Sequence, residues 1–240
     1  IIHPEDYKRV RRLSETVRNP AHDRFKAEYR LRHRDGHWIW VLDRARVHLR
    51  DAAGNPTRTA GVCMDVSRRK ETELRLEYLV DHDELTALLN RRGIWQAVQR
   101  IHAHTKRTGQ PYCLAMLDLD HFKQVNDGYG HAVGDRVLVY VAETLRWGLR
   151  EADWIGRWGG EEFVVVMPGT REVQAVLVLE RLRRRVSRRA IEVEGHTIIV
   201  TISAGIAACQ PLRDTPRDLL ERADSALYRA KALGRNRISY

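Results

Sequence analysis

The 240-residue sequence has only three cysteines, and no two of them form a CxxC pair. A disulfide framework or a thiolate zinc site needs more cysteines at closer spacing, so both are excluded. Cys63, Cys113 and Cys209 each lie in an apolar stretch. This predicts three reduced, buried thiols and a cytoplasmic protein.

Long apolar runs are also missing. The longest, residues 197–209, is interrupted by Thr201, Ser203 and Gly205. It is shorter than the roughly 20 residues that a membrane helix needs, so no membrane segment is expected in this chain. The first residues do not have the pattern of a signal peptide, and the abrupt start at Ile1 predicts a fragment of a longer protein. An upstream membrane anchor therefore stays open.

Acidic residues are fewer than basic ones, with 32 Asp and Glu against 42 Lys and Arg, which gives a formal charge of +10. A basic balance suits nucleic acids, but it equally suits anionic nucleotides. Much of the excess is arginine within residues 181–189, a run typical of a solvated helix face. Because no recognised nucleic-acid motif accompanies it, we expect no nucleic-acid partner and keep a basic nucleic-acid binder as a remote alternative.

The chain falls into three zones. Residues 25–31 alternate between apolar and polar, 38–49 run extended and 61–66 form a last strand, and the turns between them predict an antiparallel meander. Residues 67–81 lack Gly and Pro and predict a connecting helix. From residue 83 onward, helices and strands are expected to alternate around a mixed sheet with an antiparallel central hairpin. The expected helices are 86–108, 134–149, 171–189 and 216–233, and the expected strands are 112–119, 154–158, 163–167, 197–208 and 238–240.

Acidic residues gather where two of these strands end. Asp118 and Asp120 follow an apolar strand, and residues two apart share one face of a strand. Gly159-Gly160 predicts a tight hairpin turn, because both central residues can take positive φ. The turn leads into Glu161 and Glu162, which would face Asp118. Clustered carboxylates repel one another unless a cation lies between them, so we expect a Mg²⁺ site here.

Residues 83–240 strongly resemble the GGDEF family of diguanylate cyclases. The matching segments occur in the family's order: 83–92 (DELTALLNRR), 118–127 (DLDHFKQVND), 130–131 (GH) with 134–135 (GD), 157–163 (RWGGEEF) and 230–236 (AKALGRN). The resemblance implies an α+β/α/β fold of the nucleotidyl-cyclase palm type, in which a mixed central sheet is flanked by helices. It also implies an enzyme that condenses two GTP molecules into cyclic di-GMP.

The resemblance assigns roles to individual residues. Asp118, the Leu119 carbonyl and Glu161 would bind Mg²⁺ or Mn²⁺, two ions in each half-site, and Glu161 would also help to deprotonate the ribose 3′-hydroxyl. Lys123, which can neutralise phosphate charge, joins Asp118 and Glu161 in the catalytic set. The residues implied to hold GTP are Asn126 and Asp135 at the guanine, and Phe122, Lys123, Lys231 and Arg235 at the triphosphate. Each domain would bind one GTP, so catalysis would require a homodimer.

A second resemblance concerns regulation. Residues 150–153 (READ) match the family's RxxD product-inhibition site, which implies that cyclic di-GMP binds Arg150 and Asp153 as an inhibitor, with Arg181 as a further arginine. Arginine can bind guanine through O6 and N7. An ordinary surface ion pair is the alternative interpretation.

Residues 1–66 resemble the C-terminal part of a PAS sensor domain, with an unknown ligand and signal. The resemblance implies a signalling helix over 67–82 and a cyclase domain over 83–240, regulated by the sensor. Three histidines of the meander, His33, His37 and His48, are expected to be surface residues.

Two further alternatives stay open. A catalytically silent GGDEF domain could act as a receptor for GTP or cyclic di-GMP, although silent members of the family generally lose residues that are intact here. A cyclase making a mixed adenine–guanine product is disfavoured by Asp135, because the mixed-product members of the family replace this residue.

Overall fold

The computed structural model describes residues 1–19, 21–211 and 213–240 and divides the chain into two compact units, Ile1–Glu77 and Tyr78–Tyr240. Each unit is described by itself. Across the described ranges, no helix combines the length and the apolar character needed to cross a membrane.

The first unit is an antiparallel sheet covered by a helix. β1 (Arg24–Arg32) pairs with β2 (Trp38–Arg50), which pairs with β3 (Pro56–Asp65), so the predicted meander is confirmed. Helix α1 (Pro4–Thr16) was not expected from the sequence. It packs Val10 against Ala27, Tyr29 and Val41 to form a small core.

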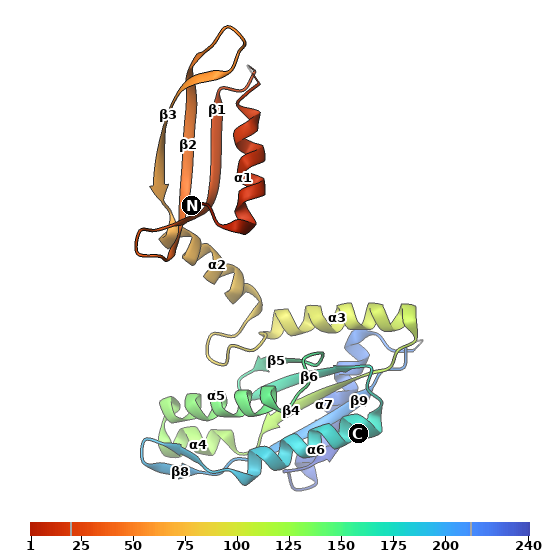
Figure 1. The fold of residues 1–240 in the computed structure, drawn as a ribbon. Helices are drawn as coiled ribbons and strands as arrows, with labels where there is room; N and C mark the ends of the chain where they lie inside the picture. The colour runs from red at the N-terminus through yellow and green to blue at the C-terminus, as the bar shows by residue number, and fades with distance from the viewer. Residues whose placement is uncertain (20, 212) are drawn as a thin grey trace. The chain divides into compact units, whose positions relative to one another are not determined.

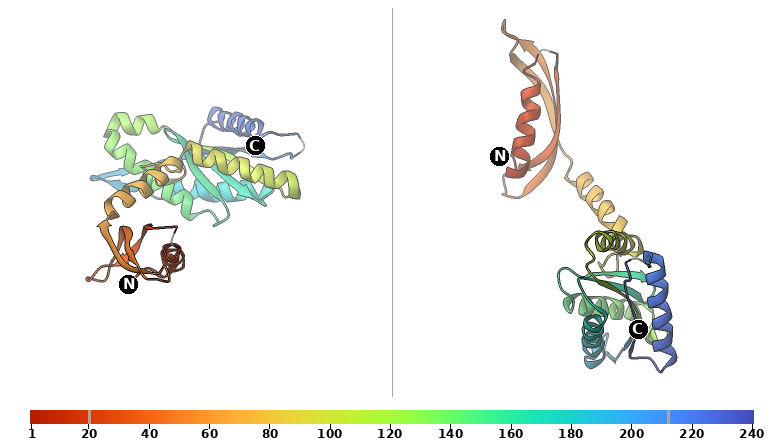
Figure 2. Two further views of the ribbon diagram at one scale, coloured as in Figure 1. Left: turned by 90° about the horizontal axis from the view of Figure 1, so that it is seen from above. Right: turned by 90° about the vertical axis from the view of Figure 1, so that its right-hand side faces the viewer.

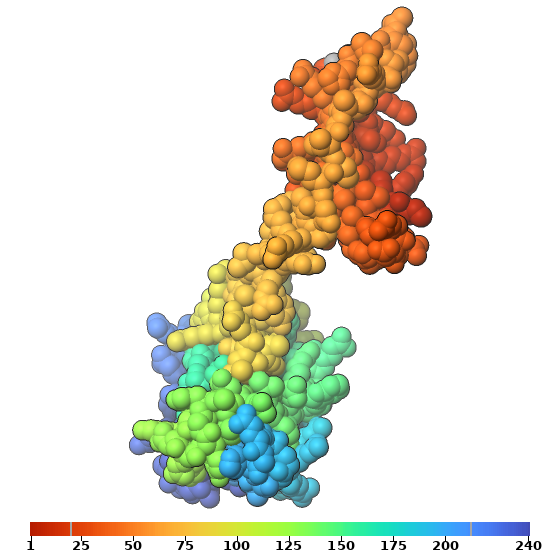
Figure 3. All heavy atoms as spheres, turned by 90° about the vertical axis from the view of Figure 1, so that its left-hand side faces the viewer, coloured from red at the N-terminus to blue at the C-terminus, as the bar shows by residue number. Residues whose placement is uncertain are grey.

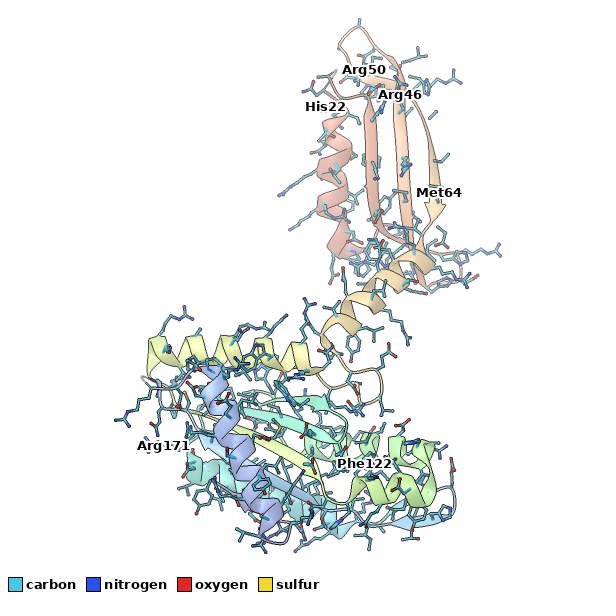
Figure 4. All side chains as sticks on the ribbon, turned by 180° about the vertical axis from the view of Figure 1, so that it is seen from behind. His22, Arg46, Arg50, Met64, Phe122 and Arg171 are labelled. Atoms are coloured by element: carbon cyan, nitrogen blue, oxygen red, sulfur yellow. The ribbon has the colours of Figure 1, made fainter. Side chains whose placement is uncertain are left out.

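Ion pairs and backbone acceptors fix the edges of this unit. Asp6 of α1 accepts from Arg30 Nε at 2.9 Å. At the far end of the sheet, where Figure 4 labels Arg50 and His22, Arg50 Nη2 donates to the His22 carbonyl at 2.9 Å. Of the three thiols predicted to be buried, Cys113 is buried and Cys209 is half-buried, but Cys63 of β3 is exposed like the neighbouring Met64. The reason is that β3 is exposed along almost its whole length.

Helix α2 (Ser67–Asp81) follows β3 and begins where the connecting helix was expected. Its side chains are exposed or half-buried, which agrees with a sequence that shows no apolar stripe.

The second unit contains the mixed sheet, with strands in the order β10-β9-β4-β6-β5. The central strands β4 (Tyr112–Leu119), β6 (Glu162–Pro168) and β9 (Ile202–Ala208) are antiparallel neighbours, with β5 (Trp154–Gly159) at one edge. β10 (Ile238–Ser239) is parallel to β9 at the other edge. The predicted mixed sheet and its antiparallel hairpin are confirmed, but the hairpin, β5–β6, lies at one edge of the sheet and not at its centre.

Helices cover both faces of this sheet (Figures 1 and 2). α3 (Arg91–Thr108) and α7 (Pro216–Ala232) pack on one face, and α5 (His131–Trp147) and α6 (Glu172–Arg188) on the other. Alternate residues of β4 serve the two cores: Leu114 and Met116 face α3 and α7, whereas Ala115 and Leu117 belong to the core that includes α5 and α6.

The structure differs from the expected elements in three places. α3 begins at Arg91 rather than at residue 86, because Ala87 takes φ +56° and Asn90 caps the helix through Gly93 N. Residues 122–129, expected as a loop, form helix α4 (Phe122–Tyr129). The expected strand 197–208 is split: β8 (His196–Ile198) pairs with β7 (Ile191–Val193) in a separate hairpin, and the sheet strand β9 begins only at Ile202.

α4 and the β7–β8 hairpin lie side by side on one face of the second unit, where Figure 3 shows them in yellow-green and blue. The rings of Tyr129 and His196 are 5.0 Å apart, and Arg136 of α5 pairs with Glu194 at 3.3 Å. The hairpin therefore braces the helices that follow the acidic end of β4.

Candidate active site

The end of β4 places a buried carboxylate beside a hairpin tip. Asp118 is 6% exposed and lies opposite Glu162 in the β4–β6 register. Leu119 N donates to the Glu161 carbonyl at 3.3 Å, so Glu161 lies against the same strand end. The structure therefore brings together Asp118, Leu119 and Glu161, the residues expected to bind metal.

The hairpin is tighter than the sequence suggested. Gly159 pairs with Glu162, so the two turn residues are Gly160 and Glu161. Only Gly160 has positive φ, at +52°, which corrects the expectation that both glycines need this conformation. A two-residue turn with positive φ at its first central position suits the twist of an antiparallel hairpin.

An arginine that the sequence reasoning missed holds this hairpin. Arg157 Nε donates to the Gly160 carbonyl at 2.8 Å, and its Nη1 lies 3.2 Å from both oxygens of Asp83. Burial disfavours the charged form of Asp83, but hydrogen bonds from Thr86 and the charge of Arg157 outweigh it and lower the pKa of Asp83. Both residues lie in segments that carry the family resemblance, 83–92 and 157–163, and this was the only sequence feature that marked them.

Lys231 enters the site from the last turn of α7. Its Nζ lies 2.7 Å from Asp118 Oδ2. The approach depends on Gly205 of β9, because a Cβ at that position would lie 2.1 Å from Ala223 O and from Leu227 N of α7. The close packing of α7 on the sheet thus brings a cation to the acidic strand end.

Burial raises the pKa of Asp118, and the charges of Glu161 and Asp120 add to this effect, although Lys231 opposes it. Burial also raises the pKa of Glu162, with the charge of Asp118 as the next cause. These crowded carboxylates disfavour their own ionisation, and a cation between them would reverse that preference. Carboxylate and carbonyl oxygens are the donors that Mg²⁺ prefers, so the donor set fits this ion.

Asp120 has a structural role that the shared strand face did not reveal. It accepts hydrogen bonds from Thr201 Oγ1 and Ser203 Oγ, each at 2.7 Å, and from Asn236 N at 3.0 Å. The last of these bonds ties the segment after α7 to the end of β4. Arg235 lies in this segment with φ +60°, and its side chain is exposed.

The residues expected to hold GTP, apart from Lys231 and Arg235, lie on α4 and α5. Phe122, labelled in Figure 4, is buried at the start of α4, and Lys123 follows it with an exposed side chain. Asn126 packs against Gly134 so closely that a Cβ there would lie 1.9 Å from Asn126 Oδ1. Asp135 follows Gly134 and is exposed. Within the described ranges, neither Lys123 nor Arg235 forms an ion pair.

The RxxD segment forms a closed turn instead of a side-chain ion pair. Arg150 N donates to Asp153 Oδ2 at 3.0 Å, and Asp153 is 6% exposed. The side chain of Arg150 is exposed. Arg181 of α6 donates to the Gly148 carbonyl at 2.7 Å, which brings its guanidinium to the segment that carries Arg150.

Residues 80–237 match the family model described as "Diguanylate cyclase, GGDEF domain", and residues 1–63 match the model described as "PAS fold". Diguanylate cyclase DgcP of Pseudomonas aeruginosa is 44% identical over 156 residues, which cover 65% of this chain and 23% of that protein. Diguanylate cyclase DgcM of Escherichia coli is 38% identical over 174 residues, covering 72% of this chain and 42% of that protein. The chain thus spans less than half the length of these relatives.

Solved structures give the same match. The coiled coil and GGDEF domain of DgcB from Caulobacter crescentus, in complex with c-di-GMP, has a TM-score of 0.68 at 33% identity and covers 72% of this chain and 92% of that one. The diguanylate cyclase SiaD from Pseudomonas aeruginosa, in complex with its activator SiaC, has a TM-score of 0.65 at 42% identity and covers 71% and 65% of the two chains.

Proposed function

The chain belongs to the diguanylate cyclase GGDEF-domain family, and from this premise we propose that it condenses two GTP molecules into cyclic di-GMP and releases two pyrophosphates. The observation that carries the proposal is the convergence of Asp118, Glu161 and Lys231 at the end of β4. A buried carboxylate with a raised pKa, next to a second acid and a lysine, suits a site that handles metal ions and phosphates.

Asp118, the Leu119 carbonyl and Glu161 are the residues that would hold Mg²⁺ or Mn²⁺, two ions in each half-site. When bound, such ions lower the pKa of a hydroxyl nucleophile and offset negative charge on the leaving oxygens. Glu161 accepts the proton of the ribose 3′-hydroxyl. The freed oxygen attacks the α-phosphorus of the second GTP, and the bond to pyrophosphate breaks.

The phosphates are held by groups at two helix ends. The backbone amides of Phe122 and Lys123 open α4, and the N-terminus of a helix attracts anions. Lys231 and Arg235 contribute cations from the end of α7. The pairing of Lys231 with Asp118 suggests an exchange, in which Lys231 turns to phosphate once a metal ion neutralises Asp118.

Asn126 and Asp135 recognise the guanine. A carboxylate accepts the N–H groups of guanine, which adenine lacks at that edge, and the amide of Asn126 offers both a donor and an acceptor. The contact between Asn126 and Gly134 supports this assignment, because it fixes the amide next to the turn of α5 that carries Asp135.

Each second unit holds one GTP, so two chains meet face to face to close the ring. Arg150, Asp153 and Arg181 bind the product and inhibit further synthesis. The PAS unit regulates the cyclase through α2. The proximity of Arg181 to the turn that carries Arg150 supports the inhibitory site.

The proposal is tested by incubating the purified chain with GTP and Mg²⁺ and separating the products by chromatography, beside a Glu161→Gln control. Cyclic di-GMP from the wild-type sample alone is expected. A folded chain that binds GTP but forms no product with Mg²⁺, or with Mn²⁺ in its place, would contradict the proposal and favour a silent receptor. Replacing GTP by ATP in the same assay tests the base assignment, and equal turnover of both would contradict it.

A further inference from the structure

A cluster of metal-ligating groups lies outside the cyclase unit, in the turn between β1 and β2. One ligand atom each from His33, Asp35 and His37 lies within 4.8 Å of the other two. The two imidazole centroids are 4.6 Å apart, and His33 Nδ1 is 3.1 Å from Asp35 Oδ2. Three side chains of two ligand types that bind transition metals, imidazole and carboxylate, therefore converge within five residues.

The backbone of this turn holds the three side chains on one short loop. His33 N donates to the His37 carbonyl at 2.8 Å, and Gly36 N donates to the His33 carbonyl at 2.9 Å. Gly36 has φ +90°, a conformation that other residues rarely adopt. Because these backbone hydrogen bonds close the loop by themselves, little backbone rearrangement is needed for the side chains to converge further.

The donor set selects a class of ion. Imidazole suits Zn²⁺, Cu²⁺, Ni²⁺ and Fe²⁺, whereas Mg²⁺ prefers oxygen ligands like those at the end of β4. Around tetrahedral zinc, ligand atoms about 2.0–2.1 Å from the metal are roughly 3.3 Å from one another. The three ligand atoms lie within 4.8 Å of one another, and rotation of the side chains can shorten these distances to about 3.3 Å. Water can complete the coordination, as it does in open zinc sites.

Charged residues of both signs lie near this turn. Asp65, an acidic residue at the end of β3, lies opposite Val41 of β2, four residues after His37. Arg34 is a competing cation, with its Nε 3.7 Å from Asp35 Oδ1. Its side chain is 88% exposed, and an exposed pair of this kind contributes little free energy.

We propose that the turn between β1 and β2 binds a first-row divalent transition-metal ion, with zinc as the reference ion, through His33, Asp35 and His37. The site is independent of the proposed cyclase activity. The strand that follows the turn, β2, begins at Trp38 and is bonded to the start of the connecting helix: Trp40 N donates to Ser67 Oγ at 2.9 Å, and Ser67 N donates to Asp65 Oδ1 at 2.8 Å. An ion bound there would stiffen the beginning of β2, to which the first residue of α2 is attached.

The test is calorimetric titration of Zn²⁺ into the whole chain, with Mg²⁺ in excess to occupy the oxygen-ligand site. One zinc ion per chain is expected for the wild type and for His48→Ala, a matched control that removes an exposed histidine of β2. His37→Ala is expected to weaken zinc binding by at least about tenfold, the loss that follows even from removing a group that only orients a ligand.

A residue-level readout completes the test. The imidazole NMR signals of His33 and His37 should shift on addition of zinc, while that of His48 should not. Asp35→Asn, which keeps the shape of the side chain, should also weaken zinc binding. It tests the site independently, in case His37→Ala disturbs the fold of the turn. Equal zinc affinity in wild type, His37→Ala and Asp35→Asn, or no shift of either imidazole signal, would overturn the proposal.

Discussion

At the residue scale, two aspartates of one short segment have different roles because they meet different partners. Asp118 pairs with Lys231 and has a raised pKa, whereas Asp120 accepts three hydrogen bonds that hold the chain after α7. The sequence was enough to predict that acids gather at this strand end, because the pattern of a strand is read from residues that are neighbours in sequence. It could not separate the two roles, because Thr201, Ser203 and Asn236 reach Asp120 only through the fold.

The raised pKa of Glu162 makes a prediction about stability in the absence of metal. A carboxyl whose folded pKa lies above its unfolded value stabilises the fold in its protonated form, and this contribution is lost as the pH rises through the folded pKa. Glu162→Gln, which stays neutral, should therefore raise the melting temperature of the metal-free protein at pH 7–8, on the order of 2 °C.

The difference should vanish as the pH falls below the ordinary glutamate value of 4.5, where the wild-type group is also neutral. Thermal melts at several pH values measure it, with the exposed Glu143→Gln of α5 as the control. Addition of Mg²⁺ should narrow the gap, since a cation offsets the repulsion from Asp118. A lower melting temperature for Glu162→Gln at pH 8 would contradict the assigned electrostatics.

A second residue-scale prediction concerns product inhibition. Arg150→Ala should relieve inhibition by cyclic di-GMP while synthesis continues, because the turn is closed by the backbone N–H of Arg150 and not by its side chain. Asp153→Ala should relieve inhibition too, but it should also destabilise the fold by about 1 kcal/mol through loss of the buried acceptor. Progress curves with added product measure both variants. An unchanged inhibition curve for Arg150→Ala would remove these residues from the inhibitory site.

At the element scale, packing between α4 and α5 positions the amide of Asn126, which is proposed to bind guanine. Gly134→Ala should push the Asn126 side chain away, because the added Cβ would lie 1.9 Å from its Oδ1. The side chain can yield without unfolding the helices, so the expected result is a KM for GTP raised several-fold with little change in melting temperature.

Gly128→Ala in α4 is the matched control, since among the described residues its added Cβ meets no atom within 4 Å. It should leave KM unchanged, and better helix propensity should slightly stabilise the protein. Equal KM values for the two variants would show that Asn126 does not contact the base.

The sequence predicted the elements with strong periodicity and missed those decided by contacts. β4, β6, α6 and α7 lie close to their expected ranges. α4 was missed because its eight residues contain polar residues and a glycine typical of a loop. The expected strand 197–208 was wrong because apolar β-branched residues continue through 198–200, although β8 and β9 belong to different sheets.

Contacts across the second unit also decide how the β5–β6 hairpin is held. Arg157 and Asp83 are 74 positions apart, so their ion pair could not be derived from local pattern. The pair joins the segment after α2 to the Gly160 turn. The family motif marked both residues, but only the fold shows that they touch.

At the scale of the whole molecule, the chain contains one complete set of the residues expected at a GTP half-site, and ring closure needs a second set from another copy. The proposed condensation of two GTP molecules would therefore depend on an encounter between chains. The rate per chain should rise with protein concentration and level off where dimers dominate.

The most direct measurement is the initial rate of cyclic di-GMP formation, at saturating GTP and Mg²⁺, over a series of protein concentrations. The account predicts that cyclic di-GMP is formed and that the rate per chain falls on dilution, in step with the loss of dimers seen by light scattering. Absence of cyclic di-GMP at every concentration, or a rate per chain that stays constant where the protein is monomeric, would contradict it.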